Sequence, residues 1–155
     1  MNALLISKGE NMAGTPTMGT TLTVTKAGDE TEDLTIKSLT SIGELTGDRD
    51  ETDVTTLDSP DGAKEYRPGA VDWGSQDVAG NVTDATQMAK LRAIFDAQAI
   101  REWTIRTPAG NVERFNAFIK TFKYGEKTVD GLDTFGMTLR VSGSVKFNPE
   151  DEPAA

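Results

Sequence analysis

The sequence predicts a mainly β protein, either a β-sandwich or a barrel-like sheet, with one flanking α-helix. Apolar and polar residues alternate in several segments, as the two faces of a β-strand require. Only residues 84–99 carry a clear helical period. The chain of 155 residues is most simply one domain, because a chain of this size buries about two thirds of the surface that its unfolded form exposes.

Three regions of the chain differ in composition. Residues 1–19 are rich in Gly, Met and Thr, lack a sustained period, and are interpreted as an extended N-terminal arm. Residues 20–147 contain the predicted strands and helix, and residues 148–155 form an acidic tail with two Pro. A ribosome-binding site could be encoded just before Met12, so Met12 and Met1 are both candidate translation starts. An intact mass that includes Met1 would exclude the later start.

The first two strands are predicted at residues 21–25 and 34–37. Leu22 and Val24 alternate with Thr in the first segment, as in a half-buried strand. Ala-Gly-Asp-Glu at residues 27–30 has the chemistry of a turn. The two segments therefore predict an antiparallel hairpin.

Residues 41–68 are predicted to form a long, charged loop. Between residues 41 and 61 the apolar positions become sparse, and seven acidic residues are accompanied by one basic residue, Arg49. A loop of about 20 residues without regular structure is uncommon in a compact domain unless it has a function. Binding to a neighbouring molecule is the preferred explanation, and Pro60 and Pro68 would stiffen the segment.

A strand is predicted from Val71 to about Asn81, and the helix follows. Asp84 and Gln87 have the spacing of a capping box at its start. The helical stripe then comprises Met88, Leu91, Ile94, Phe95 and Gln98. This stripe is expected to cover one face of the sheet.

A second hairpin is predicted from residues 103–107 and 112–124. Its second strand is apolar on both faces, so both faces need cover. We assign Phe115, Ala117 and Ile119 to one face, and Phe118, Phe122 and Tyr124 to the other. The last strand, residues 134–147, alternates throughout and could span more than about 40 Å. That length favours a strand that bends across a sandwich or takes part in more than one sheet.

Composition argues against several classes of function. The chain has no Cys and no His, so it lacks thiol nucleophiles, disulfides and the commonest zinc ligands and general base. A formal charge of -9 disfavours non-specific nucleic-acid binding through phosphate neutralisation. No apolar run approaches the roughly 20 residues of a membrane helix, and no signal peptide is indicated. An enzyme would therefore have to work with carboxylates, Lys, Tyr or Ser alone, and we predict no metal, no cofactor and no membrane contact.

Two partial motifs do not meet their physical requirements. The acidic run from Asp48 lacks the Gly and the final Glu that an EF-hand loop places at its sixth and twelfth positions. Loose calcium binding by these carboxylates is a remaining alternative. Gly125-Glu126-Lys127-Thr128 lacks the Gly-Lys pair of a phosphate-binding loop and precedes a strand rather than a helix. It is interpreted as a turn.

Four short segments resemble the major tail tube proteins of long-tailed, non-contractile bacteriophages. The segments are Leu39-Thr40-Ser41-Ile42-Gly43-Glu44-Leu45, Asp53-Val54-Thr55-Thr56-Leu57-Asp58, Tyr66-Arg67-Pro68-Gly69 and Val141-Ser142-Gly143-Ser144-Val145. The resemblance extends from about Gly19 to Phe147. It implies a tail tube domain over residues 20–147, with a β-sandwich, one helix and a long loop between subunits.

This resemblance also implies a structural role in the virion, with no catalytic residue. Subunits would form hexameric rings that stack into a conduit for double-stranded DNA, which passes without tight binding. Assembly in the host cytoplasm with a tape measure protein, a tail terminator and distal tail proteins is implied as well. The lumen is expected to carry net negative charge, although the sequence does not identify its residues. Expected contacts between subunits involve Leu45, Asp48, Asp50, Asp53, Thr55, Leu57, Asp58, Tyr66 and Arg67.

Two alternatives remain open at the level of sequence. One is a tube protein of a contractile tail or a secretion apparatus, which would need a surface that binds a sheath. The other is a monomeric binding β-sandwich, which would need an exposed aromatic platform. With two Trp and two Tyr, the composition fits that second class poorly.

Overall fold

The computed structural model describes residues 14, 16–26 and 32–148. The turn expected at 27–30, most of the N-terminal arm, both candidate start residues and the acidic tail from residue 149 lie outside the described residues. The elements, in chain order, are β1 (Thr21–Val24), β2 (Leu34–Ile36), β3 (Leu39–Ile42), β4 (Asp48–Asp53), a 3₁₀ turn (Pro60–Gly62), β5 (Tyr66–Asp72), β6 (Ser75–Asn81), α2 (Ala85–Asp96), β7 (Arg101–Arg106), β8 (Val112–Tyr124) and β9 (Thr134–Phe147).

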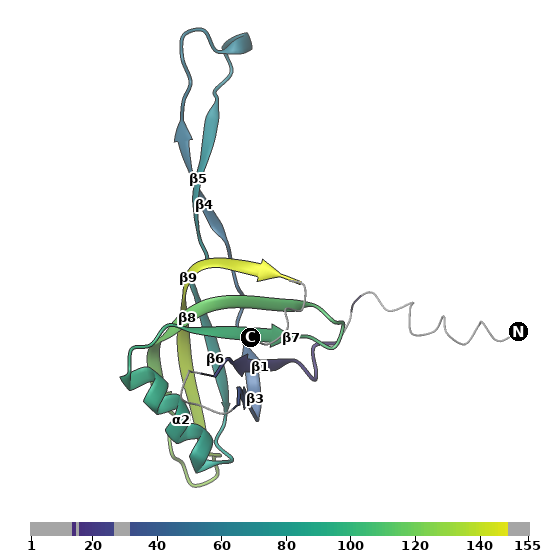
Figure 1. The fold of residues 1–155 in the computed structure, drawn as a ribbon, viewed down its shortest axis with the longest axis vertical. Coiled ribbons are helices and arrows are strands. Elements are labelled where there is room, and N and C mark those ends of the chain that lie inside the picture. Colours follow the sequence, from purple (N-terminus) through teal and green to yellow (C-terminus); the bar gives the residue numbers. More distant parts are fainter. Residues whose placement is uncertain (1–13, 15, 27–31, 149–155) are drawn as a thin grey trace, which may run out of the picture.

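Seven strands form one antiparallel sheet in the order β2-β1-β7-β8-β9-β6-β3, and β4 and β5 form a separate two-stranded sheet. The larger sheet curls into a nearly closed barrel, with α2 packed at one end (Figure 1). The class predicted from sequence, a mainly β fold with one flanking helix, is confirmed. Both predicted hairpins, β1 with β2 and β7 with β8, are also present.

The interior of the barrel is apolar and closely filled. Trp103 is fully buried at its centre, and its indole Nε1–H donates to the carbonyl oxygen of Ala117 at 3.1 Å. That bond satisfies the one polar atom of a large buried side chain. The remaining core residues are Leu22, Val24, Ile36, Val78, Leu91, Ile94, Ile105, Phe115, Ala117, Ile119, Phe135, Met137, Leu139 and Val141.

Gln87 of α2 holds the short connection between the two edge strands of the sheet. The edge strands β2 and β3 are separated only by Lys37 and Ser38, where the chain crosses from one end of the sheet to the other. Gln87 is buried; its Oε1 accepts from the Lys37 backbone N–H at 2.8 Å, and its Nε2 donates to the Lys37 carbonyl at 3.2 Å. One side chain therefore satisfies both backbone groups of a residue that belongs to neither strand.

The start of α2 differs from the predicted capping box. Asp84 is the N-cap, and its Oδ1 accepts from the Thr86 N–H at 2.9 Å. Gln87 does not reach back to Asp84, because its amide binds Lys37 instead. The helix ends at Asp96, earlier than the predicted residue 99. Tertiary hydrogen bonding therefore replaced the second half of the local motif.

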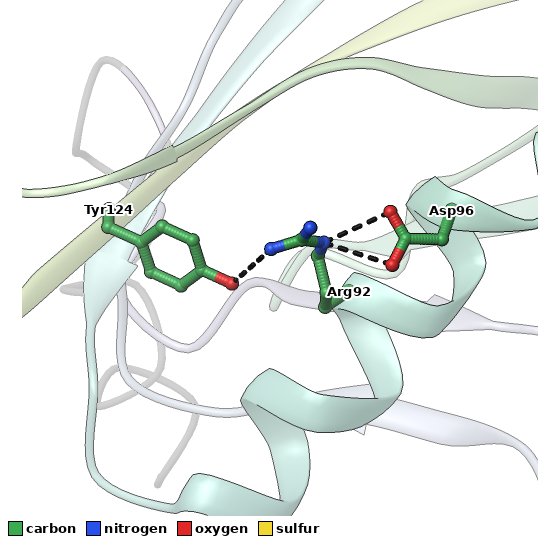
Figure 2. Close-up of polar contacts among 3 residues, drawn as sticks. All are labelled: Arg92, Asp96 and Tyr124. Carbon is green, nitrogen blue, oxygen red and sulfur yellow. Dashed lines mark hydrogen bonds and ion pairs between the residues drawn. The ribbon is translucent and has the colours of Figure 1, made fainter.

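Polar and aromatic contacts attach the outer side of α2 to β8. Phe95 and Phe122 have ring centroids 6.1 Å apart, and Phe122 and Tyr124 meet edge to face at 5.3 Å. Figure 2 shows Arg92 between Asp96 and Tyr124: its Nε donates to both Asp96 oxygens at 3.0 Å and its Nη1 donates to the Tyr124 hydroxyl at 3.1 Å. Hydrogen bonding to Tyr124 and then to Asp96 raises the pKa of Arg92. These exposed contacts fix the helix orientation rather than provide most of its stability.

The assignment of Phe122 and Tyr124 to the face opposite Ile119 is wrong. The register between β8 and β9 changes between Ile119 and Thr121, where β8 contains one more residue than β9. A one-residue bulge reverses which face the following side chains occupy. Phe122 therefore lies opposite Met137 on the core side, where the helix covers it.

β9 has the expected length and bends as it crosses the barrel (Figure 1). A second irregularity places two residues of β8, Phe115 and Ala117, opposite Val145 and Val141 of β9. Gly143 lies in the extra length with φ +97°, a backbone conformation that side chains disfavour. Glycine at this point therefore permits the bend.

Replacing Gln87 with Ala should lower the free energy of unfolding by about 1–3 kcal/mol, because both backbone groups of Lys37 would lose a buried partner. Ala has the higher helix propensity, so any loss cannot come from the helix itself. Urea unfolding measures the effect, with exposed Lys90→Ala on the same helix as the control. Equal stability of the two variants would contradict the role assigned to Gln87.

Candidate assembly hairpin

Residues 48–72, here named the projecting hairpin, stand clear of the barrel as a long two-stranded arm (Figure 1). The expectation of a loop without regular structure over 41–68 is wrong, since the segment contains β4 and the start of β5. Its strands were hard to detect because every residue of β4 is exposed, so no burial imposes an alternating pattern. The strand expected from Val71 to Asn81 is also divided, by a turn at Gly74 with φ +69°.

Local polar contacts hold the tip of the hairpin. The Thr55 backbone N–H donates to Asp53 Oδ1 at 2.9 Å, and the Glu65 N–H donates to Thr55 Oγ1 at 2.8 Å. Ser59 Oγ accepts from the Thr56 N–H at 2.9 Å and donates to Glu65 Oε2 at 2.5 Å. Hydrogen bonding by the Thr55 side chain and backbone lowers the pKa of Asp53. The tip is thus ordered by hydrogen bonds alone.

The root of the hairpin is attached firmly to the barrel. Asp72 Oδ1 accepts from the Gly74 N–H at 2.9 Å, and its Oδ2 pairs with Arg140 Nη2 at 3.0 Å. The Gly74 N–H and then Arg140 lower the pKa of Asp72. The Gly74 carbonyl in turn accepts from the Val141 N–H at 3.0 Å. Immediately before β4, Gly47 lies directly against the ring of Trp73.

Large apolar side chains at the far end of the hairpin have no cover among the described residues. Leu57 is fully exposed, with a relative accessibility of 106%, and Tyr66 is half exposed. Residues 48–72 contain eight acidic and three basic residues, so the hairpin holds more than half of the net charge of -9. An isolated two-stranded hairpin is at best marginally stable in water. Its exposed Leu and Tyr are consistent with a surface that another molecule covers.

The residues expected at subunit contacts fall into two groups. Leu45 lies before the hairpin and packs half-buried against the core near the root. The others are all on the hairpin: Asp48, Asp50, Asp53, Thr55, Leu57, Asp58, Tyr66 and Arg67. Asp53 and Thr55 organise the tip itself, whereas the side chains of Leu57 and Asp58 are exposed. Their role in assembly stays a prediction.

Several residues that hold the hairpin were not identified from the sequence. Arg49 Nη1 donates to the Gly69 carbonyl at 3.0 Å across the hairpin. Gly47 and Arg140 are also essential to the root, yet both meet their partners only through tertiary structure. The only local hint in the sequence was the glycine at position 47, because a glycine can mark a point where another group packs closely against the backbone.

A groove of about 620 Å³ opens beside the root, where β3 ends the sheet. Gln76 is buried in its lining; its Nε2 donates to the Gly43 carbonyl at 2.8 Å, and its Oε1 has no partner among the described residues. Glu113 also lines the groove, and burial raises its pKa. Within the described part of the chain, no three acidic residues are grouped as metal ligands, and no helix is long and apolar enough to cross a membrane.

A barrel with a hairpin that is anchored at its root and exposed along its length is consistent with a structural subunit that assembles with other copies. A family model described as phage tail tube protein matches residues 20–147, and the chain belongs to this family. The protein is therefore a structural component of the virion tail and not an enzyme. No curated protein matches the sequence.

Solved structures of tail and injection tubes share the fold. The tail of an empty gene transfer agent particle with C6 symmetry has a TM-score of 0.63 at 22% identity, covering 82% of this chain and 94% of that one. The SPP1 tail tube has a TM-score of 0.62 at 17% identity, covering 88% and 81%. A contractile injection system, the PVC sheath-tube complex, has a TM-score of 0.65 at 14% identity, covering 91% and 95%.

Gly47→Ala should lower the thermal unfolding midpoint by about 2–4 °C, which corresponds to roughly 1 kcal/mol for a chain of this size. A Cβ at this position would lie 2.9 Å from two ring carbons of Trp73, so the indole or the strand must move. Gly14→Ala is the control, because a Cβ there meets nothing within 4 Å. If both variants melt alike, the Gly47–Trp73 contact does not hold the root.

Proposed function

We propose that this protein polymerises into stacked hexameric rings that form the tube of a non-contractile phage tail and conduct DNA during ejection. The single observation that carries the proposal is the projecting hairpin, which is anchored at its root and uncovered along its length. Such an arm gains stability only when a neighbouring subunit covers it. The C6 symmetry of the gene transfer agent tail supports six subunits per ring.

Eight of the nine expected contact residues, all except Leu45, lie on the hairpin, which supports a role for it in assembly. Leu57 and Asp58 are exposed in the segment that joins β4 to β5, and Tyr66 is exposed at the start of β5. Contacts there would join one subunit to the next without involving the core. In the complete tail, the partners would include a tape measure protein, a tail terminator and distal tail proteins, with assembly in the host cytoplasm.

A tube protein of a contractile system is the second candidate. TM-scores of 0.62 for SPP1 and 0.65 for the PVC sheath-tube complex do not separate the two types. The non-contractile assignment rests on the resemblance of the sequence segments at residues 39–45, 53–58, 66–69 and 141–145. Negative-stain images of the virion decide between the types, since a contractile tail has a sheath outside the tube.

Electron microscopy of the concentrated, purified protein tests the function. We expect rings or tubes with a central hole for the wild type. Light scattering that reports a monomer at every concentration would contradict the proposal and favour a monomeric binding module.

Removing the hairpin tip should separate folding from assembly. A variant that joins Asp53 to Tyr66 through Asn-Gly retains the paired end of the hairpin, because these two residues lie opposite each other. We expect an unfolding midpoint close to that of the wild type and a large loss of polymerisation by sedimentation. Leu57→Ser is the matched point variant, with stability within about 0.5 kcal/mol of the wild type because the side chain is exposed. Loss of folding in either variant would show that the tip belongs to the core.

The lumen of the assembled tube should carry net negative charge. Six chains bring a large excess of carboxylates, since each has a formal charge of -9. Repulsion of the DNA phosphates would let DNA slide, whereas a basic lumen would bind it through release of counterions. A cryo-EM map of the tube identifies the lumen residues, and a lumen dominated by Lys and Arg would refute the prediction.

A further inference from the structure

Three basic side chains gather on the outer face of the barrel at one end of β7, β8 and β9. Arg114 lies between Thr104 of β7 and Lys146 of β9 in the sheet register, and Arg106 is two residues further along β7. Residues paired across strands share a face, and this face is opposite that of buried Phe115. We name Arg106, Arg114 and Lys146 the basic strip.

The described residues provide no ion-pair partner for the basic strip. Arg114 Nε makes only a long hydrogen bond, 3.4 Å, to Thr104 Oγ1, and no member of the strip forms an ion pair there. Glu102 on the same face of β7 accepts from the Thr25 hydroxyl instead. Like charges directly opposite on a sheet repel, so the isolated subunit gains nothing from placing Arg114 opposite Lys146. An acidic surface in an assembly would make this arrangement favourable.

The projecting hairpin has the complementary character. Asp48, Asp50, Glu51, Asp58 and Asp61 are exposed, and their carboxylates accept no hydrogen bond and form no ion pair within the described part of the chain. These groups stand in contrast to the structural carboxylates of the hairpin, which cap its tip or hold its root. Free acidic groups therefore concentrate on the one element that projects beyond the barrel.

One ion pair within the subunit already joins an acidic residue of the hairpin to a basic residue on the outer face of the barrel. Asp72 at the root of the hairpin pairs with Arg140, which faces outward from β9 between two buried residues. The rest of the hairpin points away from the barrel (Figure 1), and its fixed root prevents it from folding back onto the strip of its own chain. A hairpin carboxylate can therefore reach a basic strip only on another copy.

We propose that the basic strip of one copy receives the acidic projecting hairpin of the next copy. This inference rests on the proposed function, because it names the surface that the assembly hairpin contacts. The contact is heterologous, or head-to-tail. Each subunit contributes its hairpin to one neighbour and its basic strip to another, so the same contact can repeat around a ring or along a stack. It also neutralises the strip and keeps its cations from the DNA.

Charge reversal with rescue tests the pairing. R114E/K146E should raise the concentration needed for polymerisation roughly tenfold or more, because attraction becomes repulsion in every contact. E51K/D58K on the hairpin should have the same effect. The combined variant has the net charge of the wild type and should polymerise again. Sedimentation against protein concentration measures all three, and circular dichroism confirms their folding.

The matched control is K26E/K90E, which changes net charge by the same amount at exposed sites away from the strip. It should polymerise like the wild type. Equal impairment of this control, or no rescue in the combined variant, would overturn the proposal. Raising salt to about 0.5 M should weaken wild-type assembly, since the Debye length is only about 10 Å at 0.1 M and shorter above it. Assembly indifferent to salt would also count against the pairing.

If another group covers the basic strip, the charge variants give different results. If the acidic residues 149–155 of the same chain cover the strip, their deletion will remove the effect of R114E/K146E on assembly. If the strip binds nucleic acid, R114E/K146E will abolish binding of a short DNA duplex in a gel-shift assay while polymerisation is unchanged. Either result would overturn the proposal. A wild type that never polymerises would defeat the proposed function itself, whereas wild-type tubes with unaffected charge variants would defeat only this inference.

Discussion

The ladder between β8 and β9 is the constraint on which the rest of the structure depends. It is the longest pairing in the sheet, and its two irregularities curve the sheet into a barrel. The bulge after Ile119 turns Phe122 towards the helix, and the longer β9 segment at Gly143 allows the second half of the strand to bend. A continuous, regular ladder would leave the sheet flatter, with no enclosed core for Trp103.

The same ladder positions the hairpin. Val141 and Arg140 are neighbours on β9, and they bind Gly74 and Asp72 at the hairpin root, one through its backbone N–H and the other through its side chain. Curvature of the barrel and direction of the arm are therefore set by one strand. This arrangement explains how an element with no core of its own can have a defined orientation. Assembly would then start from subunits whose arms already point the same way, which reduces the ordering cost of each contact.

Much of the fold could be predicted because burial leaves a local pattern. The alternation in residues 21–24 and 134–147 and the helical period from Asp84 located strands and helix, since each of these elements buries one face. β4 was missed for the same reason: with all six residues exposed, nothing required alternation. The bulge in β8 was missed because register depends on the partner strand, which lies far away in sequence. Candidate contact residues were located by resemblance, but their anchors, Gly47 and Arg140, depend on tertiary contacts.

Charge is distributed in a way that separates folding from assembly. In the core, the buried side chains of Gln87 and Trp103 form neutral hydrogen bonds. The exposed charges concentrate on the hairpin and the outer face of the barrel. Surface charge contributes little to the stability of a single chain, but it acts over longer distances and controls association rate and partner choice. A subunit that joins identical copies benefits from this division. Under the proposed pairing, acidic arms repel each other when subunits meet in the wrong orientation, and they bind only where a neighbour presents the basic strip.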